Sequence, residues 1–249
     1  MRTPLIAGNW KMHLNLEQAA ELAAATARVA ESCTDREVMI APPFTALAAV
    51  KAVAGESLIL GAQNVCWEEK GAFTGEISPL MLRESGCKMA IVGHSERRHL
   101  FMEDDGMVNR RLRGAMAHGL TPILCIGETL EQREEGGTME VLEGQIRAGL
   151  DRVVPDGPDA LVVAYEPVWA IGTGKTASSA QAQEAHAFVR RLLVDLYEKN
   201  IAEGIRILYG GSVSPAGVDE LMAQADVDGA LVGGASLSAE SFERIIRFN

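Results

Sequence analysis

Cysteine, aromatic residues and long apolar runs are all scarce in this chain of 249 residues. The four cysteines, Cys33, Cys66, Cys87 and Cys125, form no C-x-x-C pair, so their spacing indicates neither a zinc site nor a redox pair. We expect reduced thiols in the core. No apolar run approaches the roughly 20 residues that cross a bilayer, and the N-terminal segment lacks the apolar region of a secretory signal. These absences predict a cytoplasmic protein with no membrane span and no bound metal.

Positive charge is also in short supply. Lysine and arginine number 23 against 34 aspartates and glutamates, which gives a net charge of −11. A chain with this balance is not expected to bind nucleic acid or an acidic membrane. A small anionic substrate remains open, but its site would need local positive charge.

Short apolar runs alternate along the whole chain with segments that carry helix signals. The runs are Leu5–Ala7, Val38–Ala41, Leu58–Gly61, Met89–Val92, Pro122–Cys125, Ala160–Ala164, Arg206–Tyr209 and Gly229–Val232. This alternation predicts parallel β-α units. Eight units in 249 residues match the α/β class and a single-domain (β/α)8 barrel of about 250 residues. We therefore expect one domain over residues 1–249. A doubly wound open sheet is the alternative, because periodicity does not reveal closure.

Two segments in the second half of the chain, a long helical pattern and the loop before it, allow further predictions. Residues 178–200 are predicted to form one long amphipathic helix after an N-cap at Ser178. Before it, the sixth apolar run ends on Glu166, and Pro167 stops the strand. The loop that continues to Ala177 has glycines between stiffer flanks, a pattern typical of a catalytic acid followed by a lid. A salt-bridged glutamate beside an ordinary surface loop is the alternative.

Polar residues and glycines follow several of the other runs. In a barrel of this kind, chemistry occurs where strands end and loops begin. The residues at those ends are Asn9 and Lys11 after the first run, His94 and Glu96 after the fourth, Gly210-Gly211-Ser212 after the seventh, and Gly233-Gly234 after the eighth. Glycine loops after the last two strands are the usual phosphate site of such barrels. Lys11 would supply the positive charge that such a site needs.

Each of these residues also has a plainer interpretation. Paired glycines are common in turns, and a lone lysine is usually solvated. His94 could be a buried or helix-capping residue. With its ring at a helix N-terminus, the positive dipole end would disfavour the imidazolium and leave a neutral hydrogen-bond donor. Glu96 is either a buried partner for Lys11 or a first-turn acid, and Cys125 is expected to be core packing.

Taken together, these motifs resemble the triosephosphate isomerase family. The resemblance spans essentially the whole chain in order, and the segment that contains Glu166 is its most specific part. One departure is His13, where the family often has asparagine or glycine. The matching segments are Asn9-Trp10-Lys11, Gly71–Glu76, Gly93–Arg98, Cys125–Thr129, Ala164–Ala177, Tyr209–Val213 and Leu231–Ala235.

The resemblance implies the TIM-barrel fold and interconversion of dihydroxyacetone phosphate and glyceraldehyde 3-phosphate, in glycolysis and gluconeogenesis, without a cofactor. It also implies a homodimer formed through loop 71–78, with Thr74 near the tip of that loop. The implied roles are a base at Glu166, a neutral electrophile at His94, contacts to substrate oxygen or phosphate from Asn9 and Lys11, phosphate-binding backbone N–H groups at Gly172, Ser212, Gly233 and Gly234, and supporting positions at Glu96 and Tyr209.

Two other functions are weighed against this one. One is another phosphate-binding barrel, such as a sugar-phosphate epimerase or aldolase. An aldolase would need a Schiff-base lysine at a strand end, and Lys88 precedes its strand instead. An inactive barrel that serves as a binding scaffold should have lost Lys11, His94 or Glu166, and all three are present.

Overall fold

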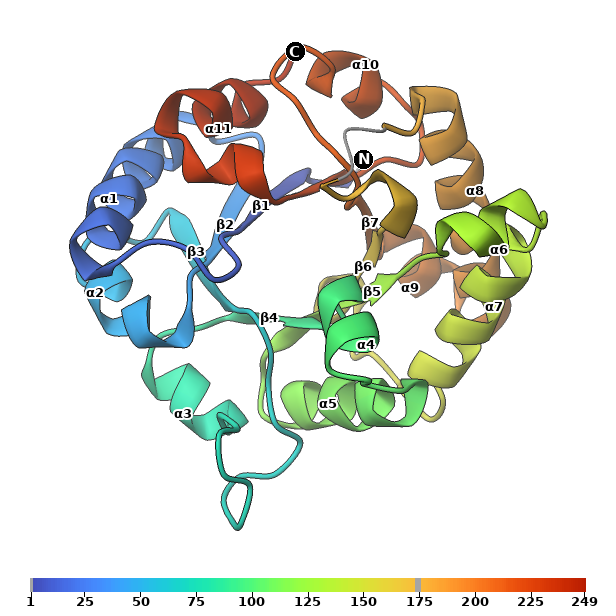
Figure 1. The fold of residues 1–249 in the computed structure, drawn as a ribbon, viewed down its shortest axis with the longest axis horizontal. Coiled ribbons are helices and arrows are strands. Elements are labelled where there is room, and N and C mark those ends of the chain that lie inside the picture. Colours follow the sequence, from blue (N-terminus) through green and yellow to red (C-terminus); the bar gives the residue numbers. More distant parts are fainter. Residues whose placement is uncertain (1, 173–175) are drawn as a thin grey trace.

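The chain folds into a closed ring of parallel strands surrounded by helices (Figure 1). The structure is a computed structural model and describes residues 2–172 and 176–249. Strands pair in sequence order and β8 pairs with β1, so the barrel is confirmed and the open sheet is excluded. The strands are β1 (Leu5–Asn9), β2 (Glu37–Ala41), β3 (Leu58–Ala62), β4 (Met89–Val92), β5 (Thr121–Ile126), β6 (Val162–Tyr165), β7 (Arg206–Tyr209) and β8 (Gly229–Val232).

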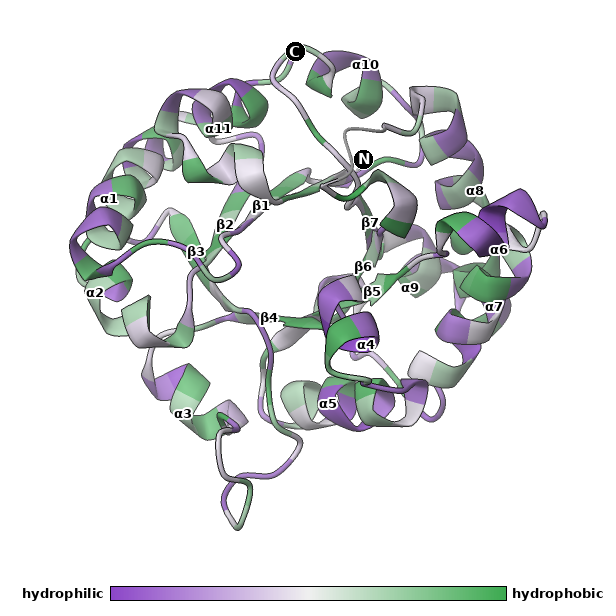
Figure 2. Cartoon of the chain, viewed as in Figure 1, coloured by the Kyte–Doolittle hydropathy of each residue, from purple (hydrophilic) through white to green (hydrophobic). Residues whose placement is uncertain are grey.

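Helices follow the strands and form the outer layer. Figure 2 shows apolar residues mostly on the faces turned towards the strands and hydrophilic residues on the outer faces. One apolar cluster fills the barrel interior, and a larger one fills the space between strands and helices. The helices are α1 (Leu16–Ser32), α2 (Leu47–Lys51), α3 (Pro79–Glu84), α4 (Ser95–Leu100), α5 (Asp105–Ala117), α6 (Leu130–Glu134), α7 (Thr138–Gly149), α8 (Ser179–Leu196), α9 (Lys199–Gly204), α10 (Val218–Met222) and α11 (Ala239–Ile246).

The prediction of one helix over residues 178–200 is wrong. Ser178 does cap the helix, because its side chain accepts the backbone N–H of Gln181. However, α8 ends at Leu196 and α9 begins at Lys199. Tyr197 lies between them with an extended backbone, at φ −130° and ψ 161°, and its side chain packs against the core. Tertiary packing of this ring therefore breaks a segment whose local pattern is continuous.

The sixth strand also begins later than predicted. Ala160 belongs to a short 3₁₀ turn, Pro158–Ala160, and β6 starts at Val162. Proline fixes φ in the range of a helical turn and has no N–H for a strand ladder. Pro158 therefore favours the turn over an extended start.

All four cysteines are free, as expected, and three of them are buried in the core. Cys33 departs from the prediction because it is only half-buried. Burial raises the pKa of the Cys87 thiol to about 12. Within the described part of the chain, no helix is both long and apolar enough to cross a membrane.

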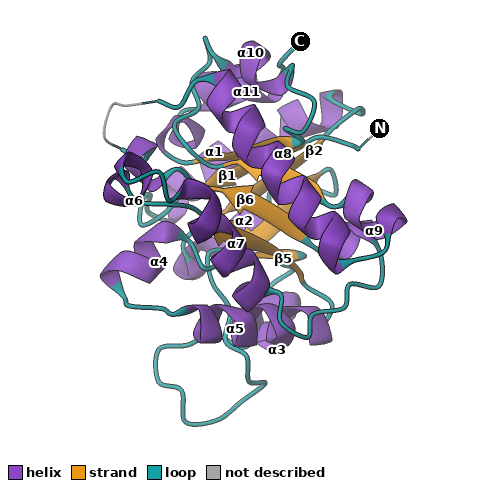
Figure 3. Ribbon diagram, turned by 90° about the vertical axis from the view of Figure 1, so that its right-hand side faces the viewer, coloured by secondary structure: helices purple, strands orange, loops and turns teal. Residues whose placement is uncertain are grey.

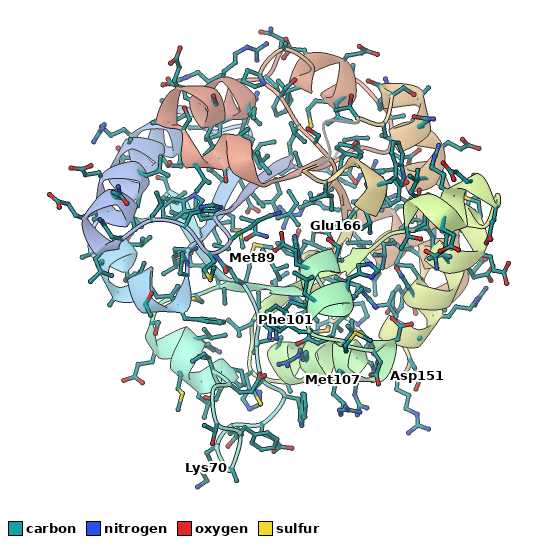
Figure 4. All side chains as sticks on the ribbon, in the orientation of Figure 1. Lys70, Met89, Phe101, Met107, Asp151 and Glu166 are labelled. Carbon is teal, nitrogen blue, oxygen red and sulfur yellow. The ribbon has the colours of Figure 1, made fainter. Side chains whose placement is uncertain are left out.

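The loop between β3 and α3 is the largest departure from the round outline. In Figures 1 and 3 it extends beyond the ring of helices, and Figure 4 labels Lys70 within it. Its base is held by Arg111 of α5, whose guanidinium donates to the Val65 carbonyl at 2.6 Å and to Glu76 at 2.6 and 2.9 Å. A buried side chain thus anchors a segment whose tip is exposed.

Candidate active site

The carboxyl ends of the strands surround a cavity of about 450 Å³. Residues from five of the eight strand-end loops reach it, although they are far apart in the sequence. Eight of the predicted site residues line it: Asn9, Lys11, His94, Glu166, Gly172, Ser212, Gly233 and Gly234. Glu96 and Tyr209, which were predicted to support the site, are not among its lining residues. Figure 4 places Glu166 near the centre of the ring.

Glu166 follows β6 directly, and its side chain is 2 % exposed. One carboxylate oxygen, Oε2, accepts the backbone N–H of Ser95 at 2.8 Å. The other, Oε1, lies 3.1 Å from Nε2 of His94. The site therefore holds a buried carboxylate between a ring nitrogen and the first N–H of α4.

The hydrogen bonds of His94 define its tautomer. Nδ1 accepts the backbone N–H of Glu96 at 3.2 Å, so His94 is the N-cap of α4. A nitrogen that accepts carries no proton, and the proton of a neutral imidazole is then on Nε2. The capping interpretation and the predicted donor role are thus compatible, because the ring caps the helix with one nitrogen and presents an N–H to the cavity with the other.

Lys11 brings positive charge to the cavity, beside the first turn of α4. Its Nζ lies 2.6 Å from Oε1 of Glu96, so the proposed partnership exists, although the Glu96 side chain is 40 % exposed rather than buried. The Lys11 backbone has φ +49°, a left-handed conformation that costs a non-glycine residue about 1–3 kcal/mol. Asn9 Oδ1 accepts the Lys11 N–H at 3.0 Å and Gln63 Nε2 donates to the Lys11 carbonyl at 2.7 Å. These two side chains stabilise the strained conformation.

The glycine loops after β7 and β8 also line the cavity. Ser212 and Gly234 are exposed, and a Cβ on Gly233 would lie 3.4 Å from Lys11 Cε. The ammonium stem of Lys11 therefore runs along the last glycine loop. Exposed backbone next to a cation, which at Gly234 also begins a short 3₁₀ turn, is suited to binding a phosphate group.

Two glycines leave room for Glu166 itself. A Cβ on Gly127 would fall 1.7 Å from the Glu166 carbonyl oxygen, and one on Gly210 would fall 2.8 Å from Glu166 Cγ. Glu166 also donates its backbone N–H to the Ile126 carbonyl at 2.7 Å. The loops after β5 and β7 thus enclose the residue on both sides.

The start of the predicted lid is anchored by Glu128, whose side chain is fully buried. Its Oε1 accepts Trp169 Nε1–H at 2.9 Å, the Tyr165 hydroxyl at 3.1 Å and Arg133 Nη1–H at 3.1 Å. Tyr209 packs edge-on against Tyr165, and burial raises its pKa to about 12. Of the predicted lid, residues 173–175 lie outside the described residues.

Cys125 belongs to the apolar cluster in the barrel interior. It is fully buried, and burial together with the Glu166 carboxylate raises the pKa of its thiol well above the usual value. A neutral, enclosed thiol fits the prediction of core packing.

Several residues of the site escaped the sequence analysis. His13 was given no role but lines the cavity. Ser95 contributes a backbone N–H, which no side-chain pattern reveals. Gln63 and Glu128 contact atoms that are up to 52 residues away in the sequence, the Lys11 carbonyl and the Trp169 ring nitrogen. Glu128 had one available signal, since it directly follows the fifth strand and Gly127.

A larger hollow, of about 1300 Å³, lies at the other end of the barrel, where the strands begin. Several of its charged groups pair with one another, as Arg190 does with Asp228 and Arg206 with Glu37. The smaller cavity is the better candidate because a carboxylate, an imidazole, an ammonium group and exposed glycine backbone converge on it.

Fold and site together define a (β/α)8 enzyme that moves protons on a small phosphorylated substrate. A family profile described as triosephosphate isomerase matches residues 4–249. A protein named triosephosphate isomerase from Chloroflexus aurantiacus is 55% identical over 249 residues, with 100% of each chain covered. Proteins of the same name from Syntrophotalea carbinolica and Moorella thermoacetica are each 53% identical, with all of this chain and 99% and 100% of the relatives covered. The chain belongs to the triosephosphate isomerase family.

Proposed function

We propose that this protein interconverts dihydroxyacetone phosphate and glyceraldehyde 3-phosphate, with Glu166 as the base and His94 as the electrophile. Family membership supports the reaction, an isomerisation of triose phosphates in glycolysis. The observation that carries the assignment of roles is the 3.1 Å contact between Glu166 Oε1 and His94 Nε2 at the cavity wall.

The chemistry requires a proton to leave the carbon beside a carbonyl and to return on the neighbouring carbon. A substrate carbonyl that accepts His94 Nε2–H replaces Glu166 as the partner of that nitrogen. The carboxylate is then released to take the carbon-bound proton, while the imidazole N–H stabilises the negative oxygen of the enediolate. Since Asn9 Oδ1 is engaged by the Lys11 N–H, the group that Asn9 offers the substrate is its amide NH₂.

The phosphate of the substrate binds to the glycine loops and Lys11. Backbone N–H groups of Gly172, Ser212, Gly233 and Gly234 are the proposed donors. Lys11 adds local positive charge for the anion in a chain whose net charge is −11. Ile171 lines the same cavity as Glu166, and an apolar side chain there would exclude water from the base. The enzyme requires no cofactor for these steps.

We also propose that the protein is a homodimer formed through loop 71–78 and that it acts in the cytoplasm, where glycolysis consumes triose phosphates. Two features support association. The loop extends beyond the ring of helices, and exposed apolar side chains lie near it and on the first and fourth strand-end loops. The exposed residues are Met12, Phe73, Leu80, Met81, Leu100, Phe101 and Met102.

The experiment that tests the role of Glu166 is the substitution Glu166→Gln. It keeps the size of the side chain but removes the base, so kcat should fall by roughly 10²–10⁴-fold while substrate still binds. Glu184→Gln, on the exposed surface of α8, is the matched control and should be fully active. Near-normal turnover by Glu166→Gln would contradict the assignment.

A further inference from the structure

Strand β5 continues beyond the end of its neighbour β4. The pairing between them ends at Val92 and Leu124. On its other side, β5 and the residues after it stay bonded to β6 and its extension, because Glu166 N–H donates to the Ile126 carbonyl at 2.7 Å and Val168 N–H to the Glu128 carbonyl at 3.1 Å. Beyond Leu124, the backbone groups of β5 that point away from β6 have no partner in β4. These buried groups need hydrogen bonds from elsewhere.

Two side chains occupy the place that a strand would take. Arg98 Nη2 donates to the Cys125 carbonyl at 3.2 Å. Gln145, on α7, binds both polar groups of Gly127: the Gly127 N–H donates to Oε1 at 2.7 Å, and Nε2 donates to the Gly127 carbonyl at 3.2 Å. A glutamine amide has the same donor and acceptor as a peptide group, so it can replace one strand partner at both points.

The peptide that Gln145 holds lies directly against Glu166. A Cβ on Gly127 would fall 1.7 Å from the Glu166 carbonyl oxygen and 2.6 Å from the carbonyl carbon, so the two backbones are in close contact. The next residue, Glu128, holds Trp169 at the start of the predicted lid. Because close-packed interiors transmit displacement, a shift of Gly127 would move both neighbours.

We propose that Gln145 is a positioning residue for the isomerisation, which keeps Glu166 at its place in the cavity by clamping the Gly127 peptide behind it. The inference rests on the proposed role of Glu166 as the base. Gln145 is not among the residues that line the cavity, so it acts only through Gly127 and its neighbours. A misplacement of about 1 Å can cost on the order of 10²-fold in rate, and loss of the clamp should cost kcat at least about 10-fold.

Gln145→Leu tests this, with Gln183→Leu as the matched control. Gln183, on α8, is half-buried like Gln145 and also makes two bonds to one residue: Nε2 donates to Asp226 Oδ2 at 2.6 Å, and Oε1 accepts the Asp226 N–H at 3.0 Å. Asp226 lines the hollow at the other end of the barrel. Both variants should lose thermal stability, but only Gln145→Leu should lose kcat.

Further measurements separate positioning from general destabilisation. In Gln145→Leu, inhibition by inorganic phosphate should weaken by less than kcat falls, because Gln145 bonds to Gly127 and not to the proposed phosphate donors Ser212, Gly233 and Gly234. The kinetic isotope effect for substrate deuterated at the transferred position should rise, because proton transfer becomes slower than the other steps. If kcat falls no further than in Gln183→Leu, or if phosphate binding falls in step with kcat, the proposal is overturned.

Gln145→Glu gives a second test that does not depend on whether Gln145→Leu folds. The introduced carboxylate keeps an acceptor for the Gly127 N–H but places negative charge beside the Gly127 carbonyl. Protonation restores a donor, so the ratio of variant to parent kcat should rise as the pH is lowered. A ratio that stays near one at every pH would refute the proposal. An active Glu166→Gln would instead refute the role of the base, whatever the Gln145 variants show.

Discussion

Gly210→Ala should slow the reaction by pushing on Glu166 without disturbing the fold. The φ of Gly210 is outside the left-handed range, so alanine adopts this backbone without strain. Its Cβ, however, would lie 2.8 Å from Glu166 Cγ. That distance is about 0.6 Å short of ordinary van der Waals contact, and the neighbouring Tyr165 carbonyl at 3.2 Å prevents the new methyl group from moving away. The carboxylate has to shift instead.

The size of the effect follows from that shift. A misplacement of about 1 Å costs on the order of 10²-fold in rate, so a displacement of several tenths of an ångström should lower kcat about 10-fold, or about 1.4 kcal/mol of transition-state stabilisation. The Michaelis constant and inhibition by inorganic phosphate should change less than kcat, because the new methyl group would meet Glu166 and the Tyr165 carbonyl rather than Ser212, Gly233 or Gly234.

Steady-state rates in both directions, measured beside circular dichroism spectra, provide the assay. Gly144→Ala is the control: nothing lies within 4 Å of a Cβ there, and the residue is exposed on α7. That variant should be fully active and about 0.5–1 kcal/mol more stable. A kcat for Gly210→Ala within twofold of the parent would refute the claim that Gly210 leaves space for the base.

Two further predictions concern assembly and acid stability. Thr74→Arg, in the exposed loop, should give a monomer with impaired activity; sedimentation of a fully active parent as a monomer at micromolar concentration would contradict the dimer. His186 is fully buried, donates from Nδ1 to the Asp226 carbonyl at 3.0 Å, and its pKa is lowered by burial to about 4. Between that pKa and the ordinary value of 6.5, the ring is protonated in the unfolded chain but neutral in the folded protein. The free energy of unfolding therefore falls as the pH falls, and at about pH 5 it is lower than at neutral pH by roughly 2 kcal/mol. The drop in thermal midpoint from about pH 7 to about pH 5 should therefore be smaller in His186→Asn, and an equal drop would show that this ring does not titrate as described.

Local patterns in the sequence were sufficient for most of the fold. Short apolar runs, Ser178 as a helix cap and Pro167 as a strand stop act within a few residues of their own positions, and such signals can be read directly. They failed at residues 178–200, where Tyr197 packs into the core and divides a continuous helical pattern into α8 and α9. They also placed the start of β6 too early, at Ala160.

The sequence by itself determined which chemical groups stand at the strand ends and, through the family resemblance, which reaction they serve. Only the tertiary structure decided how those groups meet. Closure of the ring brings the Ser95 N–H to Glu166, 71 residues away, and the Gln63 amide to the Lys11 carbonyl, 52 residues away. The clamp of Gln145 on Gly127 likewise joins a helix to a strand end. These contacts depend on barrel register and on helix packing against the strands, and neither leaves a periodic signal within a short window of residues.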